Sequence, residues 1–383
     1  MGAGPAGLVL AHILHLEGID SVVLESRSRQ YVESRVRAGV LEQGTVDLLS
    51  SIGVGDRLHR EGLVHEGIEL QFAGERHRID FPSLTGGRRI TVYGQQEVLK
   101  DLIAARLGTG RPLLFEVSDV AVDGFESESP SIRFRHGGEE IELRCDFIAG
   151  CDGFHGICRE SIPEGVLTVF DREYPFAWLG ILAAAPPSND ELIYAYHEQG
   201  FALHSMRSPT LTRLYLQVRP DEDLDRWPDE RIWAELEQRL DLEGWTLNTG
   251  EIIEKGVTGM RSFVVEPMQC GRLFLAGDAA HIVPPTGAKG LNLAVADVRV
   301  LAEGLAAWFE KGDGSALERY SAEALRRVWR AEHFSWFMTS MLHRLDDGDD
   351  FDVKLQLAQL AYVCMSARAA ASLAENYVGL EHV

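Results

Sequence analysis

Apolar and polar positions follow helical and strand periods along the first third of the chain. An apolar run of helical length follows the glycine-rich residues 2–7 and ends at Gly18, and a short buried strand comes directly after it. This order is the second half of a βαβ unit, in which helices pack against a parallel sheet. Helices are predicted over residues 8–16, 35–60 and 98–107, and strands over residues 21–24 and within 65–95.

The middle of the chain is rich in strands, and its last third is rich in helices. A short apolar strand and a long helix follow the strand-rich section, so the α/β pattern is completed before the helical end begins. The acidic residues 346–350 predict an exposed break between helices. Strands are predicted within residues 113–149 and 170–220 and over 272–276, and helices over 228–240, from 291 onward and through most of the chain after 315.

The charge and the cysteine content narrow the classes of partner. The formal net charge of −22 should repel phosphate backbones, so nucleic acid is not an expected partner. A carboxylate substrate would be repelled as well and would need a local arginine clamp. The five cysteines lack zinc-site spacing, so no metal is expected, and such sparse thiols fit a cytoplasmic protein. Neither a membrane span nor a signal peptide is predicted.

Gly2, Gly4 and Gly7 form a dinucleotide-binding pattern, GAGPAG, at the start of a helix. Two glycines allow a tight turn close to a pyrophosphate, and the third allows close packing of helix and strand. The helix N-terminus then faces the phosphates. Glu25, at the end of the next strand, is placed to bind ribose hydroxyls. An ordinary glycine turn has the same pattern, so the prediction depends on the helix, the strand and Glu25 together.

Two further motifs follow short buried strands. In Gly277-Asp278 the carboxylate can accept hydrogen bonds from a sugar-alcohol chain, although a simple helix N-cap would have the same sequence. The next helix begins near Leu291, and its free N–H groups can stabilise negative charge on a ring system. Residues 151–153, Cys-Asp-Gly, are a turn when taken alone. The three motifs in this order are a specific signature of a nucleotide site.

The three motifs together resemble those of the single-component flavoprotein aromatic hydroxylases. The resemblance runs from Gly2 to Leu380 and includes residues 37–44, 148–156 and 261–292. It is strongest to the members that hydroxylate 4-hydroxybenzoate to 3,4-dihydroxybenzoate (protocatechuate) in the degradation of aromatic compounds. It implies FAD as cofactor, a nicotinamide reductant, and O2 that reacts through a flavin C4a-hydroperoxide.

The resemblance also implies a fold. It predicts an α/β chain with a glutathione-reductase-like FAD-binding fold over residues 1–168 and a β-rich substrate domain over residues 169–260. Residues 261–383 should complete the FAD site and form a C-terminal helical region at the interface of a homodimer. A strand should precede Gly2 in the middle of the sheet, yet only Met1 does. We therefore expect the first strand to be missing and FAD to be held loosely.

The resemblance assigns residues to each cofactor. The nicotinamide is expected to be NADPH, with NADH tolerated, because Arg27 and Arg29 suit a 2′-phosphate while Ser26 replaces an expected arginine. The residues expected at FAD are Gly2, Gly4, Gly7, Glu25, Arg35, Arg37, Gln95, Arg213, Asp278, Leu291 and Asn292. The residues expected at the nicotinamide cofactor are Arg27, Tyr31, Arg35, Arg37, His155 and Arg261.

Arginine and tyrosine residues of the strand-rich section predict a clamp for a carboxylate. Arg207 can form two parallel hydrogen bonds, and Ser205 and Tyr215 can each add one. A surface strand with solvated arginines is the simpler interpretation of these residues alone, and the resemblance favours the clamp. On a regular strand, His204 and Met206 should point to the face opposite Ser205.

Two tyrosines are assigned to a proton relay by the resemblance. Tyr194 should bond the phenolic oxygen of the substrate, Tyr377 should extend the chain, and His65 should end it because histidine titrates near neutral pH. The carbonyl of Pro285 should contact the same phenol. Without the resemblance, either tyrosine is an ordinary core residue. A phenol has a pKa of about 10 in water, and its phenolate is more electron-rich, so removing its proton favours attack by electrophilic oxygen.

Two other functions stay open at this point. Tyr196 and Leu214 differ from the best-known members of the family and are expected to shift substrate preference slightly. A sister hydroxylase of a related anionic phenol would keep the clamp but make a different product. A non-catalytic flavin-binding redox protein would bind FAD without substrate-stimulated oxidation of the nicotinamide.

Overall fold

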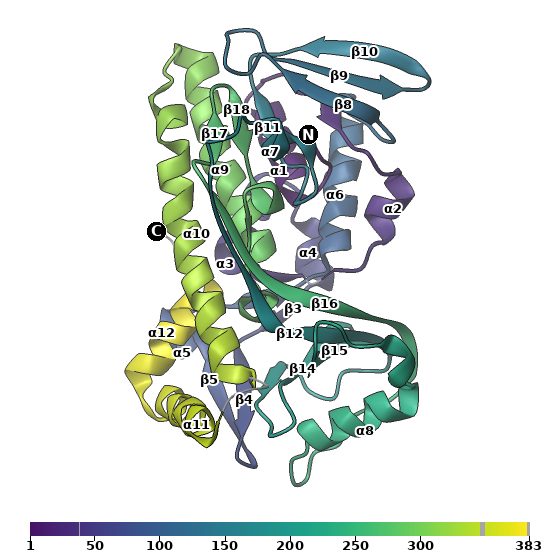
Figure 1. Cartoon of the computed structure of the whole chain (residues 1–383), viewed down its shortest axis with the longest axis vertical. Helices are drawn as coiled ribbons and strands as arrows, with labels where there is room; N and C mark the ends of the chain where they lie inside the picture. The colour runs from purple at the N-terminus through teal and green to yellow at the C-terminus, as the bar shows by residue number, and fades with distance from the viewer. Residues whose placement is uncertain (38, 345–348, 381–383) are drawn as a thin grey trace.

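The computed structural model describes residues 1–37, 39–344 and 349–380, and it shows two β-containing parts joined along one side by a long helix (Figure 1). This helix is α10, Ser315–Leu342, which runs from the upper part of the molecule to the lower part. The predicted acidic break at residues 346–350 lies mostly outside the described residues.

The upper part contains two pieces of sheet that Met1 and Gly2 connect, with parallel pairs β1–β7 and β11–β18 and an antiparallel strand β17 beside β18. The Met1 amino group donates to the Ala149 carbonyl at 2.9 Å, and Gly2 N–H donates to the Leu24 carbonyl at 2.7 Å. No strand of the described residues lies between the two pieces, and a cavity of about 510 Å³ lies beside Met1 and Gly2. The pieces are β1 (Val23–Leu24) with β7 (Leu113–Leu114), and β11 (Ile148–Gly150) with β18 (Leu273–Leu275) and β17 (Gln269–Cys270).

Helices and a small antiparallel sheet enclose these strands. α1 packs against α6 and α9, and its buried face is almost wholly apolar. A three-stranded sheet caps the top of Figure 1, where only its inner side is buried. These elements are α1 (Pro5–Leu16), α6 (Gln95–Gly108), α9 (Gly290–Lys311), α7 (Ile157–Glu160), η2 (Gly277–Ala279), β8 (Ser118–Asp123), β9 (Ser131–His136) and β10 (Glu139–Arg144).

The predicted continuous helix over residues 35–60 is wrong. The structure has strand β2 first, and helices begin only at Gln43. β2 pairs with β6, about fifty residues later, and this non-local pairing leaves no signal in local helical spacing. Gly39 passes so close to Tyr93 that a Cβ would lie 1.9 Å from its carbonyl oxygen. This region contains α2 (Arg29–Ser34), β2 (Val40–Glu42), α3 (Gln43–Ser51), α4 (Asp56–Glu61), β3 (Leu63–His65) and β6 (Ile90–Val92).

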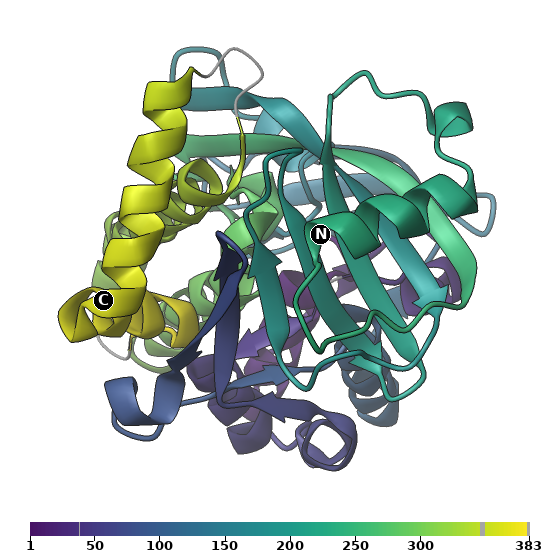
Figure 2. The same cartoon turned by 90° about the horizontal axis from the view of Figure 1, so that it is seen from below.

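An eight-stranded sheet forms the lower part, with helices on both faces. Apolar residues of α8 pack with Leu214 and Leu216 on one face, and α10, α11 and α12 cover the face that carries Tyr194 and Leu203. Figure 2 shows the green helix α8 across the strands and the yellow helices beside them. The strands, in spatial order, are β19 (His281–Ile282), β16 (Glu251–Glu266), β12 (Thr168–Ala184), β15 (Leu211–Val218), β14 (Ala202–Ser208), β13 (Leu192–Ala195), β4 (Gly67–Phe72) and β5 (Glu75–Asp80).

The long strands β12 and β16 extend from the upper part into the lower part (Figure 1). The domain division expected near residues 168 and 260 therefore falls within continuous strands, and it remains a prediction. The remaining short elements and the last helices are α5 (Phe81–Thr85), η1 (Leu224–Arg226), α8 (Asp229–Arg239), η3 (Pro285–Gly287), α11 (Asp350–Met365) and α12 (Ala367–Val378).

No single helix of the described residues is both long and apolar enough to cross a membrane. One pair of helices, α11 and α12, meets that length and composition only when the two are taken together, and they meet at a bend of 92°.

Candidate active site

The glycine turn forms an open cradle at the start of α1. Gly2 has a φ of +89°, and a Cβ on Gly7 would lie 2.0 Å from the Gly2 carbonyl oxygen, so both positions require glycine. A Cβ on Gly4 would meet nothing within 4 Å, and no side chain caps the helix. The free N–H groups of α1 therefore face open space, which suits a phosphate.

Glu25 lies against this turn, as expected for a ribose-binding carboxylate. Its two oxygens accept hydrogen bonds from Ala3 N–H at 2.7 Å and from Arg27 N–H at 2.8 Å. These contacts fix the carboxylate beside the turn and leave further lone pairs on both oxygens for a ligand.

A second open helix start lies at α9. Lys289 precedes the helix without capping it, and a Cβ on Gly290 would meet nothing within 4 Å. Leu291 and Asn292 contribute the next backbone N–H groups, which lack partners within a helix. The Asn292 side chain itself is fully occupied, since it bonds Glu42 N–H, Thr45 and the Val40 and Ala288 carbonyls. This helix start fits negative charge on a flavin ring, through its backbone and not through the Asn292 side chain.

The remaining residues expected at FAD come from several separate segments. Asp278 is exposed in η2 and interacts with Arg37. Desolvation first, and then the charge of Arg35, lower the pKa of Arg37, while Asp278 opposes this shift. Gln95 is the first residue of α6. Its backbone nitrogen lies close to Gly39, since a Cβ built on Gly39 would be only 2.8 Å from it. The segment that carries Asp278 lies beside both helices, since a Cβ on Gly277 would lie 3.2 Å from Ala294 of α9 and 3.6 Å from Ala6 of α1, so the residues present fit FAD.

The residues expected at the nicotinamide cofactor form two groups. On α2, Arg35 donates to the Tyr31 hydroxyl at 2.9 Å, and the guanidinium groups of Arg27 and Arg35 lie 5.4 and 5.7 Å from the Tyr31 ring centre. In the second group, Phe154 lies between His155 and Arg261 and contacts both. The first group is exposed and cationic, as a phosphate site requires.

Arg207 forms the expected clamp with Ser205 and Tyr215. Its guanidinium lies 3.3 Å from the Ser205 hydroxyl and 3.2 Å from the Tyr215 hydroxyl. No carboxylate of the described residues pairs with Arg207, and burial lowers its pKa. A buried cation without an anionic partner is costly, so this site favours an anionic ligand. Arg213 lies beside the clamp, with Glu254 at 3.4 Å and its guanidinium over the Tyr215 ring.

Strand register places the clamp and Tyr194 on one face of the sheet. Tyr194 pairs with Leu203, which pairs with Tyr215, so the two tyrosines lie two strands apart. That separation is roughly 10 Å, about the length of a small aromatic acid with its hydrogen-bond partners. Leu214, between Arg213 and Tyr215, packs on the opposite face, away from this row.

The two flanking residues on β14 differ in their contacts. His204 packs near Trp245 and accepts a hydrogen bond from Ser188 N–H, on the face away from Ser205. Met206 was expected on that same face, and its pairing with Thr212, two residues from Leu214, agrees with this, although its side chain joins the buried cluster that contains Tyr194 and Tyr196. The irregularity of the strand begins only after Met206.

The two relay tyrosines are in direct contact. Their hydroxyl oxygens are 2.5 Å apart, both side chains are buried, and burial raises the pKa of each hydroxyl. His65 is buried as well, and burial lowers its pKa to about 4. The expectation that His65 titrates near neutral pH is therefore wrong: it is a neutral imidazole at pH 7, with one nitrogen able to accept a proton and the other able to donate one.

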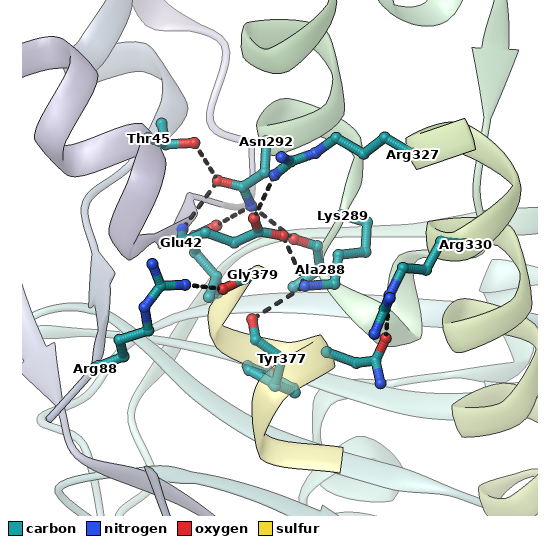
Figure 3. Close-up of polar contacts among 12 residues, drawn as sticks. Glu42, Thr45, Arg88, Ala288, Lys289, Asn292, Arg327, Arg330, Tyr377 and Gly379 are labelled. Atoms are coloured by element: carbon teal, nitrogen blue, oxygen red, sulfur yellow. Dashed lines mark hydrogen bonds and ion pairs between the residues drawn. The ribbon is translucent and has the colours of Figure 1, made fainter. Parts of the chain in front are cut away.

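A buried ion pair holds the segment that carries Tyr377 (Figure 3). Lys289 Nζ donates to Glu42 at 2.7 Å and to the Tyr377 carbonyl at 3.0 Å. Arg327 of α10 donates to the other Glu42 oxygen at 2.8 Å, and Arg88 donates to the Gly379 carbonyl. Burial lowers the pKa of Lys289, and Glu42 opposes that shift.

Pro285 begins the short turn η3, just before α9. Its carbonyl accepts Ala288 N–H at 2.9 Å and has a second lone pair for a ligand. Ala288 has a φ of +54°, a left-handed conformation that residues other than glycine seldom adopt outside functional sites. The turn thus presents the Pro285 carbonyl in a fixed direction.

Sequence reasoning missed several residues that hold the site. Glu42 and Lys289 both lie within stretches that carried the family resemblance, but their ion pair spans 247 positions. Trp178, Thr339 and His343 gave no signal, because a buried polar residue within an apolar helix or strand looks like ordinary core.

Comparison with known proteins agrees with this geometry. Residues 1–335 match the family described as FAD binding domain. The chain is 49% identical over 383 residues to p-hydroxybenzoate hydroxylase from Acinetobacter baylyi, covering 100% of this chain and 95% of that protein. It is 28% identical over 335 residues to 6-methylpretetramide 4-monooxygenase from Streptomyces rimosus, covering 80% and 75% of the two chains.

Solved structures show the same fold. The crystal structure of p-nitrophenol 4-monooxygenase from Pseudomonas putida aligns with a TM-score of 0.85 at 20% identity, covering 100% of this chain and 98% of that chain. The complex of aklavinone-11 hydroxylase with FAD and aklavinone aligns with a TM-score of 0.74 at 22% identity, covering 89% and 68%. With its glycine cradle, its two open helix starts and its full-length identity to a known hydroxylase, the chain belongs to the FAD binding domain family, in the group that includes p-hydroxybenzoate hydroxylase.

Proposed function

We propose that this chain is a cytoplasmic FAD-dependent monooxygenase that converts 4-hydroxybenzoate to 3,4-dihydroxybenzoate with NADPH and O2. One oxygen atom enters the ring beside the phenol carbon, the other leaves as water, and NADPH supplies the two electrons. The observation that carries the proposal is the guanidinium of Arg207, which is largely buried, unpaired with any carboxylate of the described residues, and bonded to Tyr215 on the sheet face that carries Tyr194. The 49% identical relative named p-hydroxybenzoate hydroxylase supports the same substrate.

Arg207 would hold the substrate carboxylate, with Ser205 and Tyr215 adding hydrogen bonds. The ring would then extend along the sheet face, so that its phenol reaches Tyr194. When bound, FAD supplies the redox chemistry: it takes a hydride from the nicotinamide and activates O2.

The tyrosine pair would move the phenol proton. Tyr194 accepts that proton as it passes its own to Tyr377, and His65, whose two ring nitrogens have no hydrogen-bond partner among the described residues, would be the next acceptor. Both tyrosines have raised pKa values, so neither rests as a phenolate, and the negative charge stays on the substrate, where it activates the ring. The Pro285 carbonyl, which has a second lone pair free, would contact the same phenol.

The direct test of the function is oxidation of NADPH and of NADH by the FAD-loaded protein with a panel of hydroxybenzoates. We expect 4-hydroxybenzoate to stimulate NADPH oxidation and to yield 3,4-dihydroxybenzoate, measured by chromatography. The value of kcat/KM should be higher for NADPH, because Arg27 is exposed and suits a 2′-phosphate, while Arg29, the second arginine expected there, pairs with Glu33 at 2.7 Å. Oxidation that no phenol stimulates would favour a redox-binding protein, another product would favour a sister hydroxylase, and an NADH preference would overturn the NADPH assignment alone.

Arg207→Lys should weaken 4-hydroxybenzoate binding while FAD stays bound. Lysine keeps the charge but loses the planar pair of donors. Hydrogen bonds to charged groups contribute about 1.5–3 kcal/mol, so the Kd from titration of flavin absorbance should rise by about tenfold or more. Arg231→Lys, on the exposed side of α8, is the matched control and should leave the Kd unchanged. An unchanged Kd in Arg207→Lys contradicts the clamp.

Tyr194→Phe should preserve substrate binding but lower the product formed per NADPH consumed. Without the hydroxyl the phenol keeps its proton, and oxidation of NADPH proceeds without ring attack. General acid–base groups typically contribute a hundredfold or more, so we expect a drop of about tenfold or more in this ratio. Tyr174→Phe is the control, because Tyr174 packs against the same buried cluster but bonds Ser262 and not the tyrosine pair. A ratio equal to that of the parent enzyme would refute the relay.

We propose that the enzyme is a homodimer that pairs through α10 and α11. Large apolar side chains are exposed on these helices, where burial in a second copy would be favourable. Sedimentation velocity should give about 85 kDa, twice the chain mass of 42.5 kDa, and Met365→Glu should lower it. A monomer for the parent protein at micromolar concentration would contradict this interface. The exposed residues are Trp329, Trp336, Phe351, Leu355, Tyr362 and Met365.

A further inference from the structure

The C-terminal end of α10 carries three buried polar residues on one face. Ser335, Thr339 and His343 are four residues apart, so they follow one line along the helix, and each is at most 1% exposed. In Figure 1 this end of α10 lies in the lower part of the molecule, beside the eight-stranded sheet. Polar groups so fully buried require partners, and the partners of two of these residues lie at different ends of the substrate region.

Thr339 holds the turn that presents Pro285. Its hydroxyl donates to the Thr286 hydroxyl at 2.9 Å, and Thr286 is the central residue of η3 and fully buried. The neighbouring Gly287 lies so close to α10 that a Cβ would be 2.6 Å from the Ser335 hydroxyl oxygen. The position of the Pro285 carbonyl therefore depends directly on this face of α10.

His343 holds the aromatic wall behind the clamp. The indole N–H of Trp178 donates to His343 Nε2 at 2.7 Å. Indole is only a donor, so Nε2 must be the acceptor and Nδ1 must carry the proton, which it donates to the Thr339 carbonyl at 3.0 Å. Burial lowers the pKa of His343 to about 3, which keeps the ring in this neutral tautomer. Phe176 and Phe201 pack against the ring at 4.6 and 4.5 Å between ring centres.

Trp178 connects His343 to the clamp, because it bonds His343 and also packs against Tyr215. Its ring centre lies 4.6 Å from that of Tyr215, and the Tyr215 hydroxyl lies 3.2 Å from the Arg207 guanidinium. A hydrogen-bonded indole cannot rotate without breaking a buried bond, so it restricts the Tyr215 ring. The chain of contacts runs from His343 through Trp178 and Tyr215 to Arg207.

We propose that Thr339 and His343 are positioning residues that fix the two ends of the substrate region from one helix, Thr339 the phenol end and His343 the carboxylate end. This inference rests on the proposed function, which assigns Pro285 and Arg207 to those ends. Thr339 lies in the last turn of α10 and His343 is the residue that caps it, bonded to the Thr339 carbonyl through both its backbone N–H and its ring, so the distance between the ends is set by the end of one helix. Neither residue touches substrate.

The test compares Thr339→Val and His343→Leu, each with a conservative variant that keeps the hydrogen bond. Valine has nearly the shape of threonine without the hydroxyl, and Thr339→Ser keeps the hydroxyl. Glutamine at 343 places an oxygen near the position of Nε2 and can accept from Trp178. The exposed Ser340→Ala, one residue along, is the matched control. The measurements, on the FAD-loaded full chain, are Tm, the Kd of 4-hydroxybenzoate from flavin absorbance, and product per NADPH.

The two residues should give different signatures. Thr339→Val should lower product per NADPH about three- to tenfold with an unchanged Kd, and His343→Leu should raise the Kd about three- to tenfold with a nearly unchanged product ratio at saturating substrate. These factors correspond to the loss of one buried hydrogen bond. Thr339→Ser and His343→Gln should restore most of each loss, while Ser340→Ala should match the parent.

Equal effects of both substitutions on both measurements, in proportion to a lower Tm, would overturn the inference, because general loosening of the core predicts that pattern. Variants that match the parent enzyme would overturn it too. If either variant fails to fold, Thr339→Ser and His343→Gln carry the test, and both must then show weaker forms of the two separate signatures. A parent enzyme that yields no 3,4-dihydroxybenzoate overturns the proposed function instead, and the product analysis separates this result from failure of the inference.

Discussion

The ion pair between Lys289 and Glu42 is the contact on which the geometry of the active site depends. It joins the end of β2 to the start of α9, and both partners also bind elsewhere: Lys289 to the Tyr377 carbonyl and Glu42 to Arg327. Removing Glu42 would leave the buried Lys289 charge without an anionic partner, which costs several kcal/mol, and removing Lys289 would leave Glu42 with Arg327 alone. The same pair therefore fixes the open helix start for the flavin, the segment that carries Tyr377 and the attachment of α10.

Arg207 shows the opposite arrangement of a buried charge. Among the described residues it has hydroxyl and carbonyl partners but no carboxylate. Burying this cation costs desolvation free energy, and the binding of an anionic ligand offsets part of that cost. The contrast explains how a chain with a net charge of −22 can select a carboxylate: the attraction is local and buried, while the acidic surface opposes unspecific anions.

The sequence predicted the parts of the fold that depend on local pattern, and it missed those that depend on distant pairing. Helices α1, α6, α8 and α9 follow apolar periodicity and were expected near their observed bounds. The strand β2 was predicted as helix, since its partner β6 lies far along the chain. Arg207, Ser205 and Tyr215 were assigned by resemblance and lie together, whereas burial moves the pKa of His65 far below the value that the sequence suggested. No local pattern reports such burial.

The two ends of the substrate region differ in the charge that their protein groups carry at pH 7, and burial is the cause at the phenol end. At the clamp, the Arg207 guanidinium is permanently charged and has no carboxylate partner among the described residues. At the other end, burial raises the pKa of Tyr194 and Tyr377 and lowers that of His65, so these three groups are neutral at pH 7. A proton leaving the phenol can move along neutral hydroxyls, and the nearby cation Lys289 is already paired with Glu42. The phenolate formed in the proposed reaction is therefore not stabilised by an ion pair, and its electrons remain available to the ring carbon that is attacked.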